Sequence, residues 1–560
     1  MFKKTDPNPQ LDIFTAPSMQ LGSRASKKYS DPNAWHNQFY SLVTTKINEE
    51  IFKPLFPEGK KCGRPNASIR ILVAMSALKE GFGCSDEDLF EKCEFDLLTR
   101  KALGMELLTD VTPSIDTYYL FRRRICEYQE RTGIDLMQLC FEQLAGNQVR
   151  LLKISGKCVR MDSKLIGSSI ARQSRYELIH TTLVKFLKTC TLSNLSPEKE
   201  ELAKEYLKED SSKTVYRSDS DTLQSNLARI GNFIMEMLAT FPATSPAHDL
   251  LLRLFEEQYV VMDGKAVLRD KKEVKADSLQ NPNDPDATYR AKNDQKVQGY
   301  VTNITETVEE GKPNIITSVQ VETAVFADCH FLQEAVENSE RVTDSTIEDL
   351  YADGAYQSPD NREFAKNHNA MQLKTGKMQG GCRWELIPHD EDGLTIREIA
   401  TGNTYEAVKA VTMQGSRKRW RIPWNNKTGW RYFEDKDIKA YQLRKQIESL
   451  PLEEQHKRNN VEAAMFQYSF HTRKGKTRYR GLLKHRMHAY SRCMWMNLRR
   501  MVIFQISTFQ RSIFALFGPI REAFGSFKAI SRKIFTSGAD CYVSLRMTTL
   551  ARLDSKYVPF

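Results

Sequence analysis

The chain has 560 residues, of which 40% are hydrophobic and 27% are charged, so we expect a globular protein of two to four domains with a packed core. Its net charge of +11 mildly favours a polyanionic partner. The 11 cysteines are odd in number and form no Cys-x-x-Cys pair, which argues against structural zinc and a disulfide framework and fits a reducing cytoplasm.

Neither a signal peptide nor a membrane-spanning helix is predicted. The first residues contain no apolar core. The most apolar late stretch, residues 501–519, is interrupted by Gln505, Gln510 and Arg511, which is typical of a packed helix. We therefore expect a cytoplasmic protein that makes no use of a membrane.

The N-terminal part is expected to be helical. Residues 1–35 are polar and rich in Pro, Asn and Ser, which predicts a loose arm, and residues 36–150 are expected to form a helical domain. Apolar residues at helical spacing over residues 69–80 predict its first clear helix, ended by Gly81 and Gly83.

Two further helices are expected in this domain. Ser85 and Asp88 form a capping box for the first, which runs to about residue 93, and residues 112–114 start the second, which runs to about residue 129. Helix-turn-helix units that read DNA have this arrangement, and the last helix carries Arg122, Arg123 and Arg124. The alternative is a helical bundle with a solvated basic face, and we prefer the DNA-reading interpretation.

A β-type run over residues 157–162 ends in the acid Asp162. Ser163 and Gly167 then predict a turn. A carboxylate at the end of a strand is held rigidly and still reaches solvent, which suits a metal ligand. The alternative for a lone Asp is that it only caps the turn.

Further strands and helices follow in an order typical of a mixed α/β sheet. Residues 174–285 are expected to form a helical insertion, with an amphipathic stripe from Leu223 to Phe241 that indicates packing rather than chemistry. Strands are then expected at residues 299–305, 314–321, 347–353 and 369–374, with helices at 328–338 and from 358. The third of these strands also ends in an acid, Asp353, followed by Gly354.

A small β insertion is expected at about residues 380–430. Short β-like runs at residues 384–387, 394–396, 405–408 and 419–422 alternate there with turn residues. Four cations give this insertion a basic edge, namely Arg417, Lys418, Arg419 and Arg421.

A helix that begins near Pro451 carries a third acid. Glu462 follows Arg458 by one turn and lies beside an apolar stripe formed by Val461, Ala464, Met465 and Tyr468. This stripe predicts that the helix packs on the sheet and holds Glu462 at the margin of the contact.

The stretch from residue 463 to residue 521 contains no Asp or Glu. Residues 471–500 alone hold ten Lys or Arg, among them Arg473, Lys474, Lys476, Arg478, Arg480 and Lys484. A charge run is usually a solvated face, but the absence of acids favours contact with nucleic acid, which would depend strongly on salt.

Two strand-end Asp residues, a helical Glu and a basic strip suit metal-dependent phosphoryl chemistry. Mg²⁺ prefers carboxylates and waters, and two such ions can activate a nucleophile and stabilise the leaving oxygen of a phosphodiester. Three carboxylates that lie close together repel one another without cations, which is a further indication of metal.

The chain resembles the DDE transposases of bacterial insertion sequences. The motifs that carry the resemblance are Met161–Ser168, Ser174–His180, Asp284–Ala287 with Gly299-Tyr300, Asp353-Gly354-Ala355-Tyr356, and Arg458-Asn459-Asn460-Val461-Glu462. It implies an RNase H-like mixed sheet flanked by helices in a catalytic domain at residues 151–500, followed by a helical tail at 501–560.

The resemblance also implies an activity and its ligands. Asp162, Asp353 and Glu462 would bind two Mg²⁺ or Mn²⁺ ions, and Arg458 would contact DNA. The protein would cleave double-stranded DNA at the terminal repeats of its element and transfer the strands into target DNA as a homodimer. The family signature often has a Tyr three residues before the Arg and a Lys seven after the Glu, where this chain has Gln455 and Ser469. Lys474 and Lys476 are candidates to replace that Lys.

The alternative to a transposase is a non-catalytic DNA-binding protein derived from one. A nucleotide-driven enzyme has little support because the sequence contains no Gly-x-x-x-x-Gly-Lys-Ser/Thr loop, so no nucleotide cofactor is expected.

Overall fold

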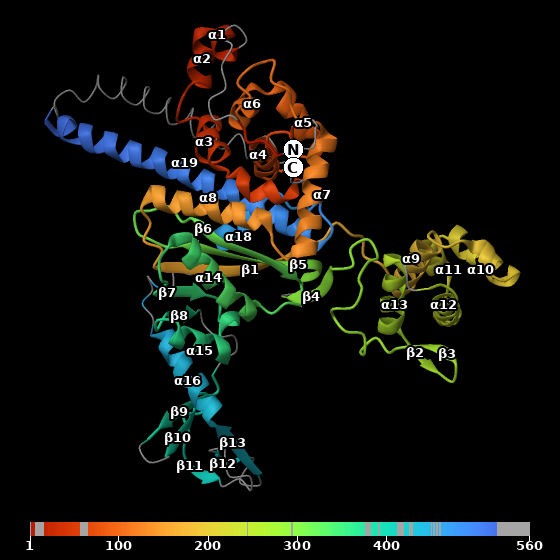
Figure 1. Ribbon diagram of the computed structural model, residues 1–560. Helices are drawn as coiled ribbons and strands as arrows, with labels where there is room; N and C mark the ends of the chain where they lie inside the picture. Colours follow the sequence, from red (N-terminus) through yellow and green to blue (C-terminus); the bar gives the residue numbers. More distant parts are fainter. Residues whose placement is uncertain are drawn as a thin grey trace.

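A computed structural model gives the arrangement of the chain (Figure 1). It describes residues 2–5, 16–56, 65–242, 245–292, 295–375, 382–389, 393–410, 419–424, 429–449, 451, 454, 457 and 461–523. In that part of the chain, no helix is both long enough and apolar enough to cross a membrane.

A mixed sheet lies at the centre of the molecule. Its strands are β1 (Cys158–Gly167), β4 (Thr288–Lys292), β5 (Gln295–Thr307), β6 (Ile316–Thr323), β7 (Asp349–Ala352) and β8 (Gln372–Thr375). The order is β4-β5-β1-β7-β8, with β6 paired to the far half of β5. β1, β7 and β8 are parallel, and β5 is antiparallel to β1. The predicted mixed α/β fold is confirmed, and the predicted strands and helices occur in the predicted order, but the edge strand β4 was not predicted.

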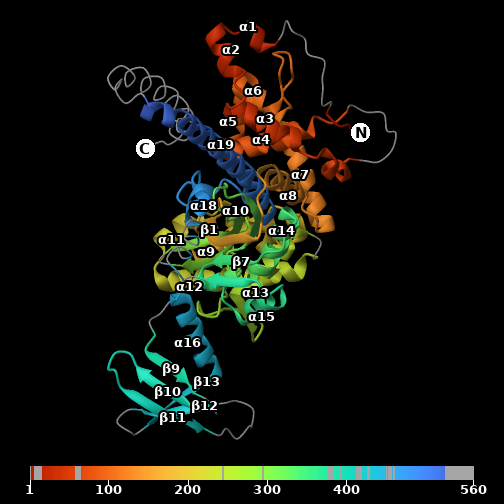
Figure 2. The same ribbon diagram turned by 90° about the vertical axis from the view of Figure 1, so that its left-hand side faces the viewer.

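Helices cover both faces of this sheet (Figures 1 and 2). Since side chains alternate along a strand, β1 directs Val159 and Met161 toward α14 (Leu332–Thr343) and α15 (Pro359–Asn367). It directs Ile166 toward α18 (Val461–Ser469) and α19 (Leu482–Ala523). Asp162 has the same parity as Ile166, so it lies on the α18 face.

The N-terminal helices share one apolar core with the sheet. They are α3 (Trp35–Leu42), α4 (Ile69–Phe82), α5 (Asp86–Phe95), α6 (Leu97–Leu103), α7 (Ile115–Thr132) and α8 (Leu136–Leu152). α4 is buried almost all round and packs on α19, where Trp495 contacts Phe82 edge-on at 5.4 Å between ring centroids. This core runs from α3 through α19 to β5 and β6.

Glycine at position 81 serves this packing. We predicted that Gly81 helps to end the first helix, but it lies inside α4, and a Cβ there would stand 2.3 Å from Trp495 Cδ2. Gly83 is the C-cap, with φ +66°, which is the left-handed conformation that glycine adopts easily. The prediction was correct for Gly83 and wrong for Gly81, because the sequence does not show which glycine meets an aromatic ring.

The predicted capping signals are confirmed. Ser85 and Asp88 form the capping box of α5, and Ser114 caps α7. Between them lies a helix that we did not predict, α6, which Asp96 caps and Gly104 ends. The second and third predicted helices are therefore not consecutive, so this segment is not the simple helix-turn-helix that we had described.

The helical insertion has a core of its own and projects to one side of the sheet (Figure 1). It contains α9 (Arg175–Leu187), α10 (Pro197–Lys208), α11 (Ser211–Arg217), α12 (Ser220–Thr240), α13 (Pro246–Gln258), β2 (Tyr259–Met262) and β3 (Lys265–Leu268). The stripe predicted on α12 is largely buried. We missed the β2–β3 hairpin, although Asp263-Gly264 between two β-type runs signals such a turn, and both residues have positive φ.

The β insertion extends from the opposite end of the molecule from the N-terminal helices (Figure 2). Its strands pair in the order β13-β12-β11-β10-β9, and α16 (Asp435–Glu448) packs against them. They are β9 (Trp384–Pro388), β10 (Leu394–Glu398), β11 (Thr404–Ala410), β12 (Arg419–Trp424) and β13 (Gly429–Glu434). The first four were predicted and the fifth was not. Arg417 and Lys418 of the basic edge lie outside the described residues.

Candidate active site and nucleic-acid interface

Asp162 lies on β1, and Asp353 directly follows the end of the parallel neighbouring strand β7. In the pairing of β1 with β7, Arg160 stands opposite Tyr351. Two residues further along each strand, Asp162 and Asp353 come level on the same face, because side chains alternate. The side chain of Asp353 caps the turn after β7 and accepts a 2.6 Å hydrogen bond from the Gly354 N–H.

The turn predicted after Asp162 is wrong. β1 continues to Gly167, and Ser163 to Gly167 pair with the antiparallel strand β5. The cause is the length of β5, which supports β1 beyond the point where β7 has ended. Asp162 therefore lies within β1 and not at its end. It stands next to the point where the neighbouring strand β7 ends.

Glu462 approaches the same place from the helix above. α18 packs through Val461, Ala464, Met465 and Tyr468, which is the predicted stripe, while Glu462 stays exposed in the first turn. The Tyr468 hydroxyl lies 3.2 Å from Thr302 Oγ1 on β5, which fixes the helix to the sheet.

The segment before α18 is fixed to the strands as well. Arg160 on β1 donates a 2.9 Å hydrogen bond to the Lys457 carbonyl oxygen. The Tyr351 hydroxyl on β7 and the Lys374 ammonium on β8 both bind the Glu454 carboxylate. Arg458, the predicted DNA contact, lies outside the described residues.

The three acids act on one another electrostatically. The pKa of Asp162 is raised to about 6, mainly by burial and in addition by the negative charges of Asp353 and Glu462. A 2.7 Å hydrogen bond from the Ser163 N–H and the charge of Lys292 oppose this rise. Like charges have this effect only when they are near, so the fold gathers the three predicted carboxylates in one region.

The carboxylates as they stand do not form a closed metal site. Among the residues that the structure describes, no three His, Cys, Asp or Glu side chains are arranged to hold a metal ion. The chemistry of the acids nevertheless fits Mg²⁺, since oxygen ligands are what it prefers and a cation would relieve the repulsion that raises the pKa of Asp162.

A buried polar chain supports the turn after Asp353, and we did not predict it. The Tyr356 hydroxyl is fully buried and donates a 2.7 Å hydrogen bond to Asn303 Oδ1. Asn303 Nδ2 donates to Gln320 Oε1 at 2.8 Å, and Gln320 Nε2 donates to Glu334 Oε2 at 3.0 Å. Burial, followed by the charge of Asp162, raises the pKa of Tyr356 well above its usual value, so this hydroxyl stays a donor.

The basic run of residues 471–500 divides into two parts. Arg486, Arg492 and Arg500 on α19 turn into the protein and bind acceptors there. Arg492 donates to the carbonyl oxygens of Glu80 and Gln467 at 2.8 and 2.6 Å. Arg500 reaches Glu306 Oε2 at 2.6 Å. These cations stabilise the fold.

The other part of the run stays at the surface. Arg473, Lys474, Arg478, Arg480 and Lys484 are exposed. Arg478 and Arg480 each use one N–H group on a backbone carbonyl, that of Gly83 at 2.8 Å and that of Ser169 at 2.7 Å. Lys476 is half-buried and donates to the Ile170 carbonyl oxygen at 2.6 Å.

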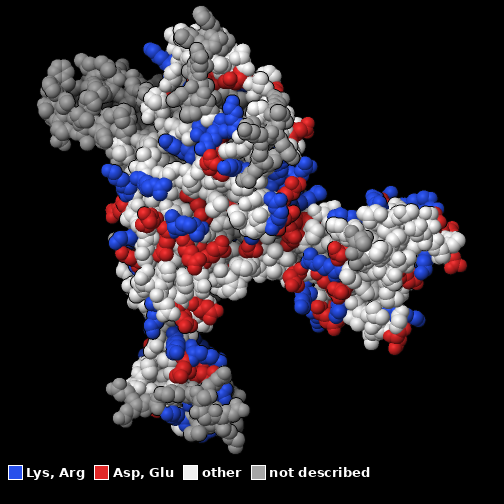
Figure 3. Space-filling model, in the orientation of Figure 1, with Lys and Arg blue, Asp and Glu red and all other residues white. Residues whose placement is uncertain are grey.

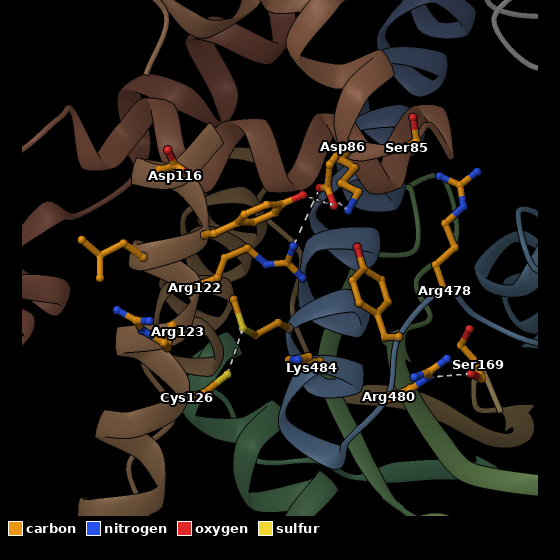
Figure 4. Close-up of a pocket in the computed structure, with 15 residues that line it drawn as sticks. Ser85, Asp86, Asp116, Arg122, Arg123, Cys126, Ser169, Arg478, Arg480 and Lys484 are labelled. Carbon is orange, nitrogen blue, oxygen red and sulfur yellow. Dashed lines mark hydrogen bonds and ion pairs between the residues drawn. The ribbon is translucent and has the colours of Figure 1, made fainter. Parts of the chain in front are cut away.

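One cavity brings the two predicted basic clusters together (Figure 4). It has a volume of about 940 Å³ and lies between α5, α7 and the start of α19. Its basic lining residues are Lys79, Arg122, Arg123, Arg478, Arg480 and Lys484. The clusters are more than 350 positions apart in the chain, and only the fold makes them one surface.

The three consecutive arginines of α7 have different environments. Arg122 is only 15% exposed; it lies over the rings of Tyr118 and Tyr479 and 3.9 Å from Asp86, so it is a packing residue of the cavity wall. Arg123 is 68% exposed and pairs weakly with Glu127. Arg124 lies over the ring of Phe56. Of the three, Arg123 is the cavity-lining residue that remains available to a phosphate.

Charge is unevenly distributed over the surface. On the face drawn in Figure 3, Lys and Arg gather over the N-terminal helices, whereas Asp and Glu gather over the region of α14. An anionic polymer would therefore avoid the α14 side of the sheet.

The N-terminal helices carry a recognisable family signature. Residues 28–124 match the family model described as Transposase domain (DUF772), a range that contains α3 to α6 and the first half of α7. No curated protein and no solved structure matches the chain. The matched range includes Arg122 and Arg123 and ends before the three acids. Together with the mixed α/β fold, this match supports a transposase family for the chain.

Proposed function

We propose that the chain is a DDE transposase with an RNase H-like core, which cleaves DNA at the ends of an insertion sequence and transfers the strands into target DNA. The observation that carries the proposal is that Asp162 on β1 neighbours Asp353, which follows the end of the parallel strand β7, and that both Asp353 and Glu462 act on the pKa of Asp162. The mixed sheet, antiparallel from β6 to β1 and parallel from β1 to β8, agrees with such a core.

The three acids would hold two Mg²⁺ or Mn²⁺ ions. Bound in this way, divalent cations activate the attacking oxygen and stabilise the leaving oxygen of a phosphodiester. The protein itself orients the ligands: the Ser163 and Gly354 N–H groups fix the carboxylates of Asp162 and Asp353. Water would be the nucleophile for cleavage and a DNA 3′-hydroxyl the nucleophile for joining, so no covalent enzyme intermediate is needed.

The exposed cations would bind double-stranded DNA. Arg123, Arg478, Arg480 and Lys484 line one cavity, and each phosphate that they neutralise releases counterions. The resemblance to transposases implies that two copies act together on two element ends, which makes the active form a homodimer.

A cleavage assay tests the proposal. Purified protein is incubated with Mg²⁺ and labelled duplexes taken from the DNA that flanks the coding sequence on each side. We expect strand cleavage by the wild type and none by Asp162→Asn, Asp353→Asn or Glu462→Gln, because each removes one ligand charge and keeps its shape. Glu348→Gln is the matched control, since this acid pairs with Lys157 on the surface and should be dispensable.

Thermal melting separates loss of chemistry from loss of folding. Each triad variant should melt no lower than the wild type without metal, because it relieves repulsion among the acids. Mg²⁺ should raise the melting temperature of the wild type more than that of Asp162→Asn. A wild-type rate of cleavage by Asp353→Asn would refute the assignment.

A second candidate is a DNA-binding protein derived from a transposase that no longer cleaves. The open arrangement of the acids favours it, since no three of them converge in the described ranges. DNA binding by the wild type with no cleavage in Mg²⁺ or Mn²⁺ would select this alternative.

A further inference from the structure

Lys164 stands next to the proposed site on the same face of the sheet. It lies two positions beyond Asp162 on β1, opposite Thr302 of β5. Two residues of a strand span about 6.6 Å, and their side chains point the same way. The Lys164 side chain therefore extends toward α18, alongside Asp162.

The Lys164 ammonium joins the two elements that carry the acids. Its Nζ donates a 2.7 Å hydrogen bond to Ser469 Oγ in the last turn of α18, the helix whose first turn presents Glu462. The Ser469 hydroxyl donates its own proton to the Met465 carbonyl oxygen at 2.9 Å. Its lone pairs are therefore left to accept from Lys164, and the ammonium is held at a defined place.

This half-buried ammonium is held by a neutral hydroxyl. Among the described residues, no carboxylate lies within ion-pair distance of Lys164 Nζ, although the charge of Asp162 acts on the pKa of Lys164. An ammonium has three donors, and Ser469 takes one of them. A half-buried cation held by a neutral hydroxyl beside a group of acids has donors ready for an anion that arrives with the substrate.

The neighbouring lysines are less well placed for that purpose. Lys476 already donates to the Ile170 carbonyl oxygen at 2.6 Å, beyond the end of β1. Lys474 is exposed in a turn, with φ +52°. Ser469 also occupies the position where the resemblance leads one to expect a lysine. α18 contains no Lys or Arg, and the ammonium beside it is that of Lys164 on β1.

We propose that Lys164 is a catalytic residue that binds a DNA phosphate beside the bond to be cleaved. The inference rests on the proposed function, since it assigns part of the substrate contact to the same site. The competing interpretation makes Lys164 only a tether between β1 and α18; in that case the hydrogen bond matters and the charge does not.

Single-turnover cleavage of the flanking-DNA duplexes distinguishes the two interpretations. Lys164→Gln keeps a hydrogen-bond donor for Ser469 and removes the charge, and we expect it to slow cleavage about 10- to 100-fold, the worth of one charge-assisted hydrogen bond. Lys164→Arg should retain most of the rate. Lys157→Ala, a surface lysine just before β1, is the matched control and should cleave like the wild type.

Relocating the charge sharpens the test. Ser469→Ala removes the tether and keeps the ammonium, so it should cost less than about threefold, as expected for a neutral hydrogen bond at the edge of a site. The double variant Lys164→Gln with Ser469→Lys supplies the ammonium from α18 and should recover at least part of the lost rate. If Lys164 is only a tether, Lys164→Gln and Ser469→Ala should slow cleavage by the same factor, and the double variant should recover none of the lost rate.

Neutral methylphosphonate links in the substrate identify the phosphate. Replacing the contacted phosphate should slow the wild type and leave Lys164→Gln unchanged, because the partner charge is already absent. Cleavage by Lys164→Gln at the wild-type rate overturns this inference alone, provided that Asp162→Asn is inactive. No cleavage by the wild type overturns the proposed function and this inference with it. Melting temperatures confirm that each variant is folded.

Discussion

The two parts of the basic run are both rich in cations but lie in opposite environments. Arg478, Arg480 and Lys484 are exposed around a cavity, whereas Arg486, Arg492 and Arg500 bind acceptors inside the protein. The acceptors come from far away in the chain: Glu306 lies on β5 and Glu80 on α4. Cations in a stretch that contains no acids can therefore still be paired with acids from other parts of the chain. Only the exposed cations are available to DNA.

The clearest case of internal pairing is Glu306. It is fully buried between two arginines, with Arg160 Nε at 2.6 Å from Oε1 and Arg500 Nη1 at 2.6 Å from Oε2. Removing one partner of such a group leaves an uncompensated charge in the interior, which costs far more than the pair itself contributes.

The largest effect that we expect is on stability. Glu306→Gln should lower the free energy of unfolding by about 3–5 kcal/mol, because it leaves the cations of Arg160 and Arg500 without their carboxylate in the interior. Arg500→Ala should also lower it, but by less, because Glu306 keeps its pairing with Arg160. Urea unfolding followed by circular dichroism measures this. Lys484→Ala, from the exposed part of the run, is the control and should stay within about 0.5 kcal/mol of the wild type. Equal effects of Arg500→Ala and Lys484→Ala would abolish the distinction between the two parts.

The next effect concerns the exposed part. Replacing Arg478, Arg480 and Lys484 together with Ala should weaken binding to all DNA sequences about equally. The logarithmic salt slope should become shallower by up to about three phosphate units. Fluorescence anisotropy at several salt concentrations gives both values. Weaker binding to flanking DNA with unchanged binding to random DNA would contradict a backbone-binding role.

A pH effect is expected where the two parts meet. Burial would raise the pKa of Glu80, but His488, with Nδ1 2.7 Å from Glu80 Oε2, and then Lys79 and Tyr479 outweigh it and hold the pKa at about 2, against 4.5 ordinarily. Because the folded-state pKa is lowered, this stabilisation is fully present above pH 4.5 and is lost as the pH falls toward 2. Glu80→Gln should therefore lose less stability than the wild type between about pH 5 and pH 3 in urea titrations. If the free energy of unfolding of Glu80→Gln fell with pH as steeply as that of the wild type, the pairing of Glu80 with His488 would be contradicted.

The smallest effect separates neighbouring arginines of α7. Arg123→Ala should reduce the salt slope of DNA binding by about one phosphate unit without a change in stability, because this side chain is 68% exposed. Arg122→Ala should instead lower the melting temperature, because Arg122 stacks on Tyr118 and Tyr479. The reverse pattern would mean that the DNA path runs along the other side of the helix.

The limits of sequence reasoning are visible in particular elements. Caps and stripes are local signals, and those of α5, α7 and α18 were predicted correctly. The β2–β3 hairpin had a local signal that we overlooked. The extent of β1 had none, because the strand beyond Asp162 exists only through its pairing with β5.

By itself, the sequence determined most of the helices and strands and singled out the three acids, because periodicity, caps and turns act over a few residues. Only the tertiary structure decided that Asp162 and Asp353 come level, that Arg123 and Arg478 line one cavity, and that Arg492 and Arg500 are internal. The physical reason is that the burial and pairing of a charge depend on neighbours hundreds of positions away.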